Sequence, residues 1–324
     1  MAKITKIDSV LGPVNTADLG ATLTHEHLLV APTGALYDST LTFDREGQLL
    51  KIAGELKQLI AAGVSTIIDP IPLELGRDVD FMADVSQAAG INIICATGLY
   101  TDQGPFAGYP SYFQRKTADE LAAIFVQEIE QGVGPRHVKP GVIKCATGPH
   151  KISQNEEKAL RAGAQASKAT GVPITTHTTD GSMGPEQMEI FMDEGLEPRK
   201  VTVGHCSDSA DIPYLTRILD TGAFLGFDRV GIEIYTKDET KVGVMAALVA
   251  MGYTSQIVFS HDNVGCMHGM GPVSRFTPTP EAQSKRRYTY LLEEFVPKLK
   301  EAGVSEEAIR QILVDNPRRY FEGE

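Results

Sequence analysis

The feature that most constrains the fold of this chain is a regular alternation of short apolar, β-rich segments with longer amphipathic segments. The expected strands are residues 21–28, 64–69, 91–97, 140–146, 173–177, 200–205, 223–227 and 256–260. The expected helices are residues 48–62, 79–89, 118–132, 154–170, 185–194, 212–220, 237–251, 281–302 and 306–314.

Eight strand–helix units in succession, with no linker or break in composition, predict an α/β fold: one closed parallel (β/α)8 barrel, or TIM barrel. We expect it to form a single domain over residues 1–324. A doubly wound open sheet is the alternative, but it would favour a glycine-rich phosphate loop, and the sequence contains no GxGxxG or Walker pattern. Two helix starts carry capping boxes, Thr117-x-x-Glu120 and Ser153-x-x-Glu156.

The net charge of the chain limits the kinds of molecule that it is expected to bind. The 324 residues include 30 Lys+Arg against 42 Asp+Glu, a formal net charge of −12. Such a surface repels phosphate backbones and anionic lipids, so we expect a small-molecule substrate and neither nucleic acid nor membrane as a partner. No segment approaches the ~18 apolar residues of a membrane span, no signal peptide is evident, and the four cysteines form no CxxC pair. These features predict a cytoplasmic protein with reduced thiols.

A His-x-His pattern closes the first expected strand. Because side chains alternate along a strand, His25 and His27 would point the same way and meet one cation, while Glu26 faces outward. Two exposed or hydrogen-bonded histidines are the alternative interpretation.

Three further side chains follow other strands and favour the metal site. His177 ends the fifth strand, His205 ends the sixth, and Asp262 follows the eighth. The carboxyl ends of barrel strands meet at the rim where barrel enzymes place their catalytic groups. Five metal-competent side chains at one rim therefore indicate a metal centre.

Lys144 is unusual because it lies in the apolar fourth strand, at a position that would aim it into the barrel. An unpaired ammonium buried among cations would be very costly. The lysine can be a neutral amine, pair with a carboxylate, or react with carbon dioxide to give an anionic carbamate. From the residues alone, the salt bridge is favoured.

The chain resembles the phosphotriesterase family of the amidohydrolase superfamily over nearly its whole length. The matching segments are Gly-Ala-Thr-Leu-Thr-His-Glu-His, Ile-Lys-Cys-Ala-Thr, Pro-Ile-Thr-Thr-His, Val-Gly-His-Cys-Ser-Asp and Phe-Asp-Arg-Val-Gly. The resemblance implies two divalent cations, with zinc favoured and cobalt, manganese or iron as alternatives. It also implies a homodimer.

The same resemblance assigns the ligands. His25, His27 and Asp262 would hold the α metal, and His177 and His205 the β metal. Carboxylated Lys144 and a hydroxide would bridge the two, and this hydroxide would attack a C=O or P=O that the β metal polarises.

Asp262 would be both ligand and catalytic proton acceptor. For the second ring nitrogen of a metal histidine, Asp208 is one candidate partner, although a helix N-cap explains it equally well.

Two more residues match catalytic positions of the lactonases in this family. Tyr100 would hydrogen-bond the ester oxygen or the attacking hydroxide, with rim packing as the alternative. Arg229 would lean over the pocket, with a salt bridge to Asp228 or another acid as the alternative. Met267, Met270 and Val273 would form an apolar channel for an acyl tail, or simply pack their loop on the barrel.

The resemblance therefore favours a lactonase for N-acyl-homoserine or other γ/δ-lactones, with promiscuous hydrolysis of organophosphate triesters. A dedicated phosphotriesterase, another amidohydrolase reaction and a non-catalytic metal-binding scaffold are the alternatives.

Overall fold

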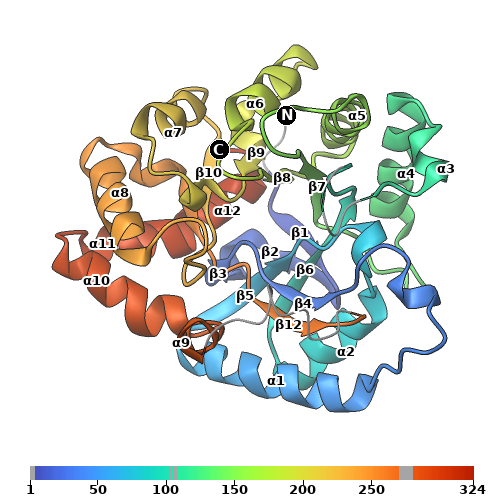
Figure 1. Ribbon diagram of the computed structural model, residues 1–324, viewed down its shortest axis with the longest axis horizontal. Coiled ribbons are helices and arrows are strands. Elements are labelled where there is room, and N and C mark those ends of the chain that lie inside the picture. Colours follow the sequence, from blue (N-terminus) through green and yellow to red (C-terminus); the bar gives the residue numbers. More distant parts are fainter. Residues whose placement is uncertain (1–3, 103, 105–107, 270–279) are drawn as a thin grey trace.

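The computed structural model describes residues 4–102, 104, 108–269 and 280–324, and Figure 1 shows a ring of helices around a central set of strands. The strands form one parallel sheet in the order β11-β10-β9-β8-β7-β6-β5-β3. They are β3 (Ala21–Leu23), β5 (Val64–Asp69), β6 (Asn92–Gly98), β7 (Val142–Ala146), β8 (Ile174–His177), β9 (Val201–Val203), β10 (Phe224–Phe227) and β11 (Ile257–Phe259). The predicted (β/α)8 barrel is confirmed.

The seam between the first and last strands of the sheet closes just beyond β3. The backbone N–H of Thr24 donates to the carbonyl of Phe259 at 3.1 Å, and the backbone N–H of His25 donates to the Ser260 hydroxyl at 2.8 Å. At this end of the seam, backbone and side-chain hydrogen bonds together join the two segments.

The first expected strand, 21–28, is wrong as one continuous element. The chain bends at residues 24–26, and a second strand, β4 (His27–Val30), starts beyond the bend. β4 pairs in parallel with β12 (Val264–Met267), outside the barrel sheet, in the register Val264↔His27. The bend arises because His25 N–H bonds to a side chain instead of a neighbouring strand.

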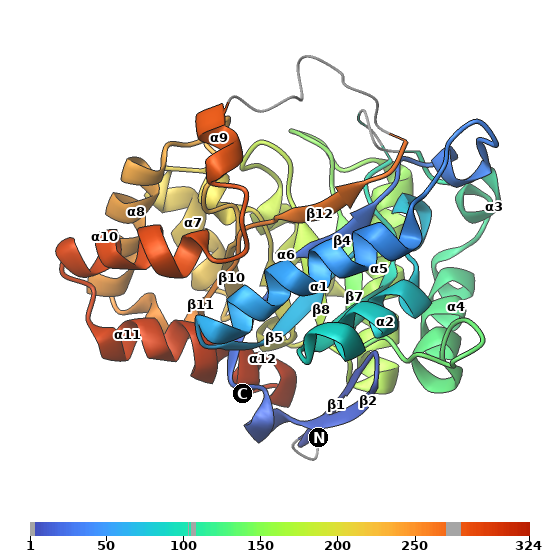
Figure 2. The ribbon, with the colours of Figure 1, turned by 90° about the horizontal axis from the view of Figure 1, so that it is seen from below.

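An N-terminal hairpin was not predicted. Its strands, β1 (Lys6–Ser9) and β2 (Gly12–Asn15), lie at the end of the barrel opposite β12 in Figure 2. Ile7 of this hairpin belongs to a buried cluster with Ile94, Val142 and Phe224, side chains contributed by barrel strands. The hairpin therefore closes the amino end of the barrel and leaves the carboxyl end for a site.

The helices lie outside the sheet, and all of those named here except the short helix Ser111–Gln114 bury side chains. They are α1 (Arg45–Ala61), α2 (Val79–Ala89), α3 (Ser111–Gln114), α4 (Ala118–Gln131), α5 (Gln154–Thr170), α6 (Gly184–Asp193), α7 (Ile212–Leu219) and α8 (Asp238–Ala250). Both predicted capping boxes are confirmed, at the starts of α4 and α5. Among the described residues, no helix is both long and apolar enough to cross a bilayer.

The C-terminal part is more broken than expected. The predicted helix 281–302 is divided into α9 (Pro280–Ser284), a π-helical turn (Leu291–Phe295) and α10 (Val296–Glu301). The chain turns between α9 and the π-helical turn, and in this connection the Tyr288 hydroxyl donates to the His27 carbonyl at 2.9 Å. The last helix continues past residue 314 as α11 (Glu306–Arg310), a π-helical turn (Gln311–Asp315) and α12 (Asn316–Glu322).

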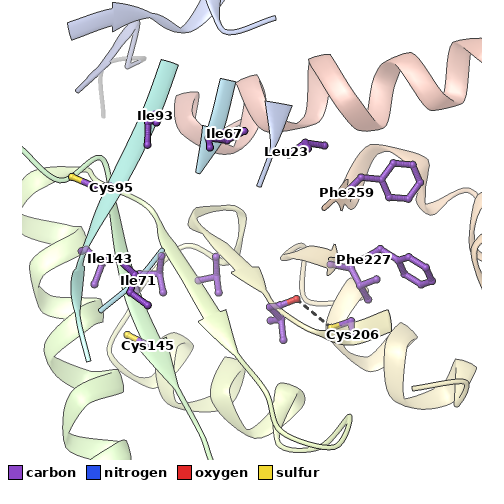
Figure 3. Packing of buried hydrophobic residues seen from close by; sticks show 14 of the residues in the cluster. Leu23, Ile67, Ile71, Ile93, Cys95, Ile143, Cys145, Cys206, Phe227 and Phe259 are labelled. Carbon is purple, nitrogen blue, oxygen red and sulfur yellow. Dashed lines mark hydrogen bonds between the residues drawn. The ribbon is translucent and has the colours of Figure 1, made fainter. Parts of the chain in front are cut away.

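The main core lies between the sheet and the helices. Figure 3 shows part of it, with Leu23, Ile67, Ile93, Phe227 and Phe259 projecting from the barrel strands. Of the four cysteines, three are buried, Cys266 is half-buried, and all four are free thiols, as predicted. This packing fixes the strands whose carboxyl ends carry the candidate site.

Candidate metal centre

The predicted metal ligands come together at the carboxyl end of the barrel. His27 Nε2 lies 3.4 Å from Asp262 Oδ1, and His25 Nε2 lies 3.9 Å from the same oxygen. His205 Nε2 lies 3.9 Å from the other Asp262 oxygen, and the ring centroids of His177 and His205 are 4.5 Å apart. Five side chains from the carboxyl ends of four barrel strands, β3, β8, β9 and β11, therefore face one small space.

Buried carboxylates hold the outer nitrogens of three of these imidazoles. Asp228 accepts from Nδ1 of both His25 and His205 at 3.0 Å, one on each oxygen. Asp69 accepts from His27 Nδ1 at 3.0 Å. Each of the three rings therefore turns its Nε2 toward the centre, which is how metal-binding histidines are usually oriented.

Sequence reasoning missed both carboxylates and named a different one. Asp208, which was one candidate partner for a metal histidine, instead accepts from Arg229 Nη1 at 2.6 Å. Asp69 ends β5 and Asp228 follows β10. The signal that would have found them is the same strand-end position that identified the histidines.

His25 is prepared to act as a neutral ligand. Burial and the neighbouring Lys144 lower the pKa of His25 to about 3. With Nδ1 bonded to Asp228, the neutral ring presents Nε2 to the centre.

Two of the candidate metal ligands have a left-handed backbone conformation. His205 has φ 59° and Asp262 has φ 53°, a conformation that residues other than glycine adopt at a cost of about 1–3 kcal/mol. Hydrogen bonds hold both residues there: His205 N–H donates to Asp228 at 2.7 Å, and Asp262 N–H donates to the His25 carbonyl at 3.0 Å. Residues held against their backbone preference cluster at functional sites.

Glu26 does not face outward as expected. Its side chain is fully buried and accepts hydrogen bonds from Ser260 and His261, which precede Asp262. Strand alternation fails here because the chain bends between β3 and β4.

Lys144 lies in the wall of the site and is 2% exposed. Its Nζ is 3.2 Å from His25 Nε2, and within the described part of the chain no carboxylate oxygen lies within 4.0 Å of it. The salt bridge that the residues alone favoured is therefore wrong. Burial lowers the pKa of Lys144 to about 8, which makes the neutral amine accessible.

Arg229 binds Asp262 and Asp208, not Asp228. Its Nε donates to Asp262 Oδ2 at 2.8 Å, and the residue is 8% exposed. Burial alone would raise the pKa of Asp262, but His205 and Arg229 hold it well below its ordinary value. Asp262 is thus an ionised carboxylate, oriented by a guanidinium.

Tyr100 lies against His177. Its hydroxyl is 3.4 Å from both ring nitrogens, and burial raises its pKa, so the phenol keeps its proton. His177 Nε2 is also 3.0 Å from the Thr179 hydroxyl. Of the expected acyl channel, Met267 is 44% exposed, whereas Met270 and Val273 lie outside the described residues.

The donor set fits a divalent cation. Ligand atoms of His25, His27 and Asp262 all lie within 4.8 Å of one another, so one ion can contact all three. Imidazole nitrogen and carboxylate oxygen are the donors that zinc and its first-row neighbours accept. His25, His205 and Asp228 also group within 4.8 Å, but there Asp228 meets the Nδ1 atoms and serves to orient the rings.

Comparison with known proteins agrees with this geometry. The family model of the phosphotriesterase family matches residues 5–321. A phosphotriesterase homology protein of Mycobacterium tuberculosis is 35% identical over 326 residues, covering 98% of each chain. An aryldialkylphosphatase of Saccharolobus solfataricus is 33% identical, covering 95% of this chain and 96% of the relative.

A solved structure is similar to this chain in both sequence and fold. A variant of a PTE-like lactonase from Deinococcus radiodurans has 32% identity and a TM-score of 0.92, covering 97% of this chain and 99% of that one. Family match, barrel and clustered ligands agree, and the prediction of a metal-dependent ester hydrolase is confirmed at this level. The chain belongs to the phosphotriesterase family.

Proposed function

We propose that this protein is a binuclear-metal lactonase that opens N-acyl-homoserine or other γ/δ-lactones and hydrolyses organophosphate triesters as a secondary activity. The observation that carries the proposal is the Tyr100 hydroxyl, 3.4 Å from the ring of His177, at the wall of the candidate centre. A protonated phenol there can donate to the ring oxygen of a lactone as the ester bond breaks. The similarity to a PTE-like lactonase supports the same activity.

Two sets of side chains would hold the cations. His25, His27 and Asp262 would bind one, and His177 and His205 the other. Lys144 as a carbamate would bridge them, which its buried position and accessible neutral amine support. When bound, two divalent cations lower the pKa of a shared water and polarise a C=O or P=O group. Zinc is the favoured metal, with cobalt, manganese or iron as substitutes.

The protein's own groups would orient the reaction and move its proton. Asp262 would accept the proton released during attack, at the carboxylate that also touches His27. Arg229 would keep this carboxylate in place through its Nε contact at 2.8 Å. The guanidinium also donates to Asp208, so two carboxylates hold the Arg229 side chain in position.

A dedicated phosphotriesterase is the second candidate, favoured by the similarity to an aryldialkylphosphatase. A lactone carbonyl and a phosphoryl oxygen develop the same negative charge, so one site can serve both reactions. Another amidohydrolase reaction and a non-catalytic scaffold are the remaining alternatives.

We further propose a homodimer in the cytoplasm, built from one domain over residues 1–324, with a small-molecule substrate and neither nucleic acid nor membrane as a partner. The net charge of −12 supports the absence of polyanionic partners.

A hydrolysis panel tests the proposal. The protein is stripped with a chelator, reloaded with zinc, cobalt or manganese, and assayed with a pH indicator on lactones of graded ring and tail size, beside paraoxon. We expect hydrolysis to require metal and kcat/KM to be highest for a lactone. A kcat/KM for paraoxon well above every lactone would establish the dedicated phosphotriesterase. Metal-independent or absent hydrolysis would support the scaffold.

A further inference from the structure

The middle residue of the His-x-His pattern has a role that the predicted ligand set does not include. The carboxylate of Glu26 is 0% exposed and lies against the segment that carries Asp262. Its Oε1 accepts from the Ser260 hydroxyl at 2.7 Å and from the His261 backbone N–H at 2.8 Å. Its Oε2 accepts from the Asn263 backbone N–H at 3.1 Å. Glu26 thus bonds to the chain on both sides of Asp262.

The His261 side chain adds a fourth donor. Its Nε2 accepts from the backbone N–H of Leu291 at 2.8 Å, so this nitrogen carries no proton. The ring proton of the neutral imidazole is therefore on Nδ1, which donates to Glu26 Oε1 at 2.8 Å. His261 links the carboxylate to the π-helical turn that starts at Leu291.

This carboxylate stands where the barrel sheet has no strand pairing. The order of the sheet runs from β11 to β3, and just beyond β3 the Thr24 N–H donates to the Phe259 carbonyl at the end of β11. Beyond that bond, the His27 N–H donates to the Asn263 carbonyl at 2.8 Å. Between these two bonds, the Asp262 N–H donates to the His25 carbonyl at 3.0 Å. The N–H groups on either side of it, those of His261 and Asn263, donate to the side chain of Glu26.

Asp262 needs such a support. Its backbone is left-handed, with φ 53°, which is unfavourable for a residue with a β-carbon. Neither neighbouring N–H can leave the Glu26 carboxylate without losing a buried hydrogen bond. The Asp262 carboxylate is thereby aimed at His27 Nε2, 3.4 Å away.

We propose that Glu26 is a positioning residue that clamps Asp262 in register with His25 and His27, and so sets the affinity of the cation held by these three groups. The proposal rests on the metal centre described under the proposed function. Glu26 touches neither ion nor substrate, so it acts on cation binding and not on the chemical step.

The conservative variant Glu26→Gln tests the clamp. All four contacts of the carboxylate are donors, so an amide NH2 would face one of them and break at least one bond. We expect one of the two cations to bind about 10–100-fold more weakly, because outer partners of metal ligands have effects of this size. Competition with a chromogenic zinc chelator measures both affinities, and circular dichroism reports the fold. At saturating zinc, we expect kcat to return to within a few-fold of the unsubstituted protein.

Glu156→Gln is the matched control. Glu156 is also 0% exposed, and it accepts from the backbone N–H groups of Asp102, Gly148 and Ser153, which carry no predicted ligand. We expect this variant to lose thermal stability as Glu26→Gln does, but to bind both cations as the unsubstituted protein does. Unchanged zinc affinity in Glu26→Gln, or an equal loss in both variants, would overturn the proposal.

A milder change covers the case in which Glu26→Gln does not fold. Ser260→Ala removes one donor to Glu26 and the acceptor of the His25 N–H. We expect a smaller loss of affinity, confined to the same cation. If Ser260→Ala folds and binds zinc normally, the clamp is wrong. If the unsubstituted protein binds no metal, the proposed function fails first, and the two failures are distinguishable.

Discussion

The two halves of the candidate centre are built to different degrees of rigidity. In the half formed by His25, His27 and Asp262, Asp228 and Asp69 hold the outer imidazole nitrogens at 3.0 Å, and Arg229 holds the Asp262 carboxylate at 2.8 Å. In the other half, His205 shares Asp228, but among the described residues the ring nitrogens of His177 have hydroxyl groups as their hydrogen-bond partners. These belong to Thr179 at 3.0 Å and Tyr100 at 3.4 Å.

The half with the three carboxylate and guanidinium contacts is therefore oriented without a cation, whereas the His177 ring is held less firmly. Charge-assisted hydrogen bonds are roughly twice as strong as neutral ones, so the first half resists reorientation. We therefore expect the cation at His25 and His27 to bind first and more tightly. In the second half, we expect the His177 side chain to change its orientation when substrate binds.

Removing Lys144, which we propose bridges both halves, should have the largest effect. Lys144→Met replaces a buried amine with an apolar side chain of similar length, so the fold is expected to persist. We expect binding of both cations and all hydrolysis to be lost together, as measured by elemental analysis and the lactone assay. Substantial activity in this variant would count against the bridging carbamate.

Asp262→Asn should remove turnover and leave the fold. The amide keeps the size of the side chain but cannot accept a proton, and loss of a proton acceptor costs about 10²–10⁴-fold in rate. We expect kcat to fall at least that far at saturating zinc, with an unchanged circular dichroism spectrum. A kcat within ten-fold of the unsubstituted protein would remove Asp262 from the proton transfer.

Asp69→Asn and Thr179→Ala test the difference in rigidity between the two halves. Asp69 accepts from His27 Nδ1 and from the Leu28 N–H, whereas Thr179 contacts His177 through one hydroxyl. We expect Asp69→Asn to weaken the tighter cation by about 10–100-fold. Thr179→Ala should weaken the looser cation by less than about ten-fold, since a single neutral hydrogen bond contributes about 1 kcal/mol. Chelator competition measures both, and the reverse order would refute the difference in rigidity.

Tyr100→Phe should have the smallest effect and a selective one. The variant removes only the hydroxyl beside His177. We expect kcat for lactones to fall more than kcat for paraoxon, because a phosphotriester with a good leaving group needs no proton at the departing oxygen. Equal losses on both substrates would reduce Tyr100 to a packing role.

The barrel and its ligands could be predicted because both follow from local rules. Each strand reads as a short apolar run, and Lys144 lies within such a run in β7. The other ligands stand at or near the ends of these runs, as His177 ends β8. The strand-end position alone brings these groups to one rim.

What could not be predicted depends on contacts between distant segments. The bend at residues 24–26 exists because Ser260, 235 positions from His25, accepts its N–H. Arg229 pairs with Asp208 and not with the adjacent Asp228, because Asp228 is already occupied by His25 and His205. The N-terminal hairpin has no apolar run long enough to signal its closure of the barrel.

The single carboxylate shared by His25 and His205 has a consequence for how such a site can diverge. Asp228 gives one oxygen to each histidine, so a mutation there is pleiotropic and disturbs both cation positions at once. Tyr100 contacts the ring of one candidate ligand, His177, and Met267 is exposed. Substitutions at such rim positions can therefore change the substrate preference while the candidate metal ligands keep their positions.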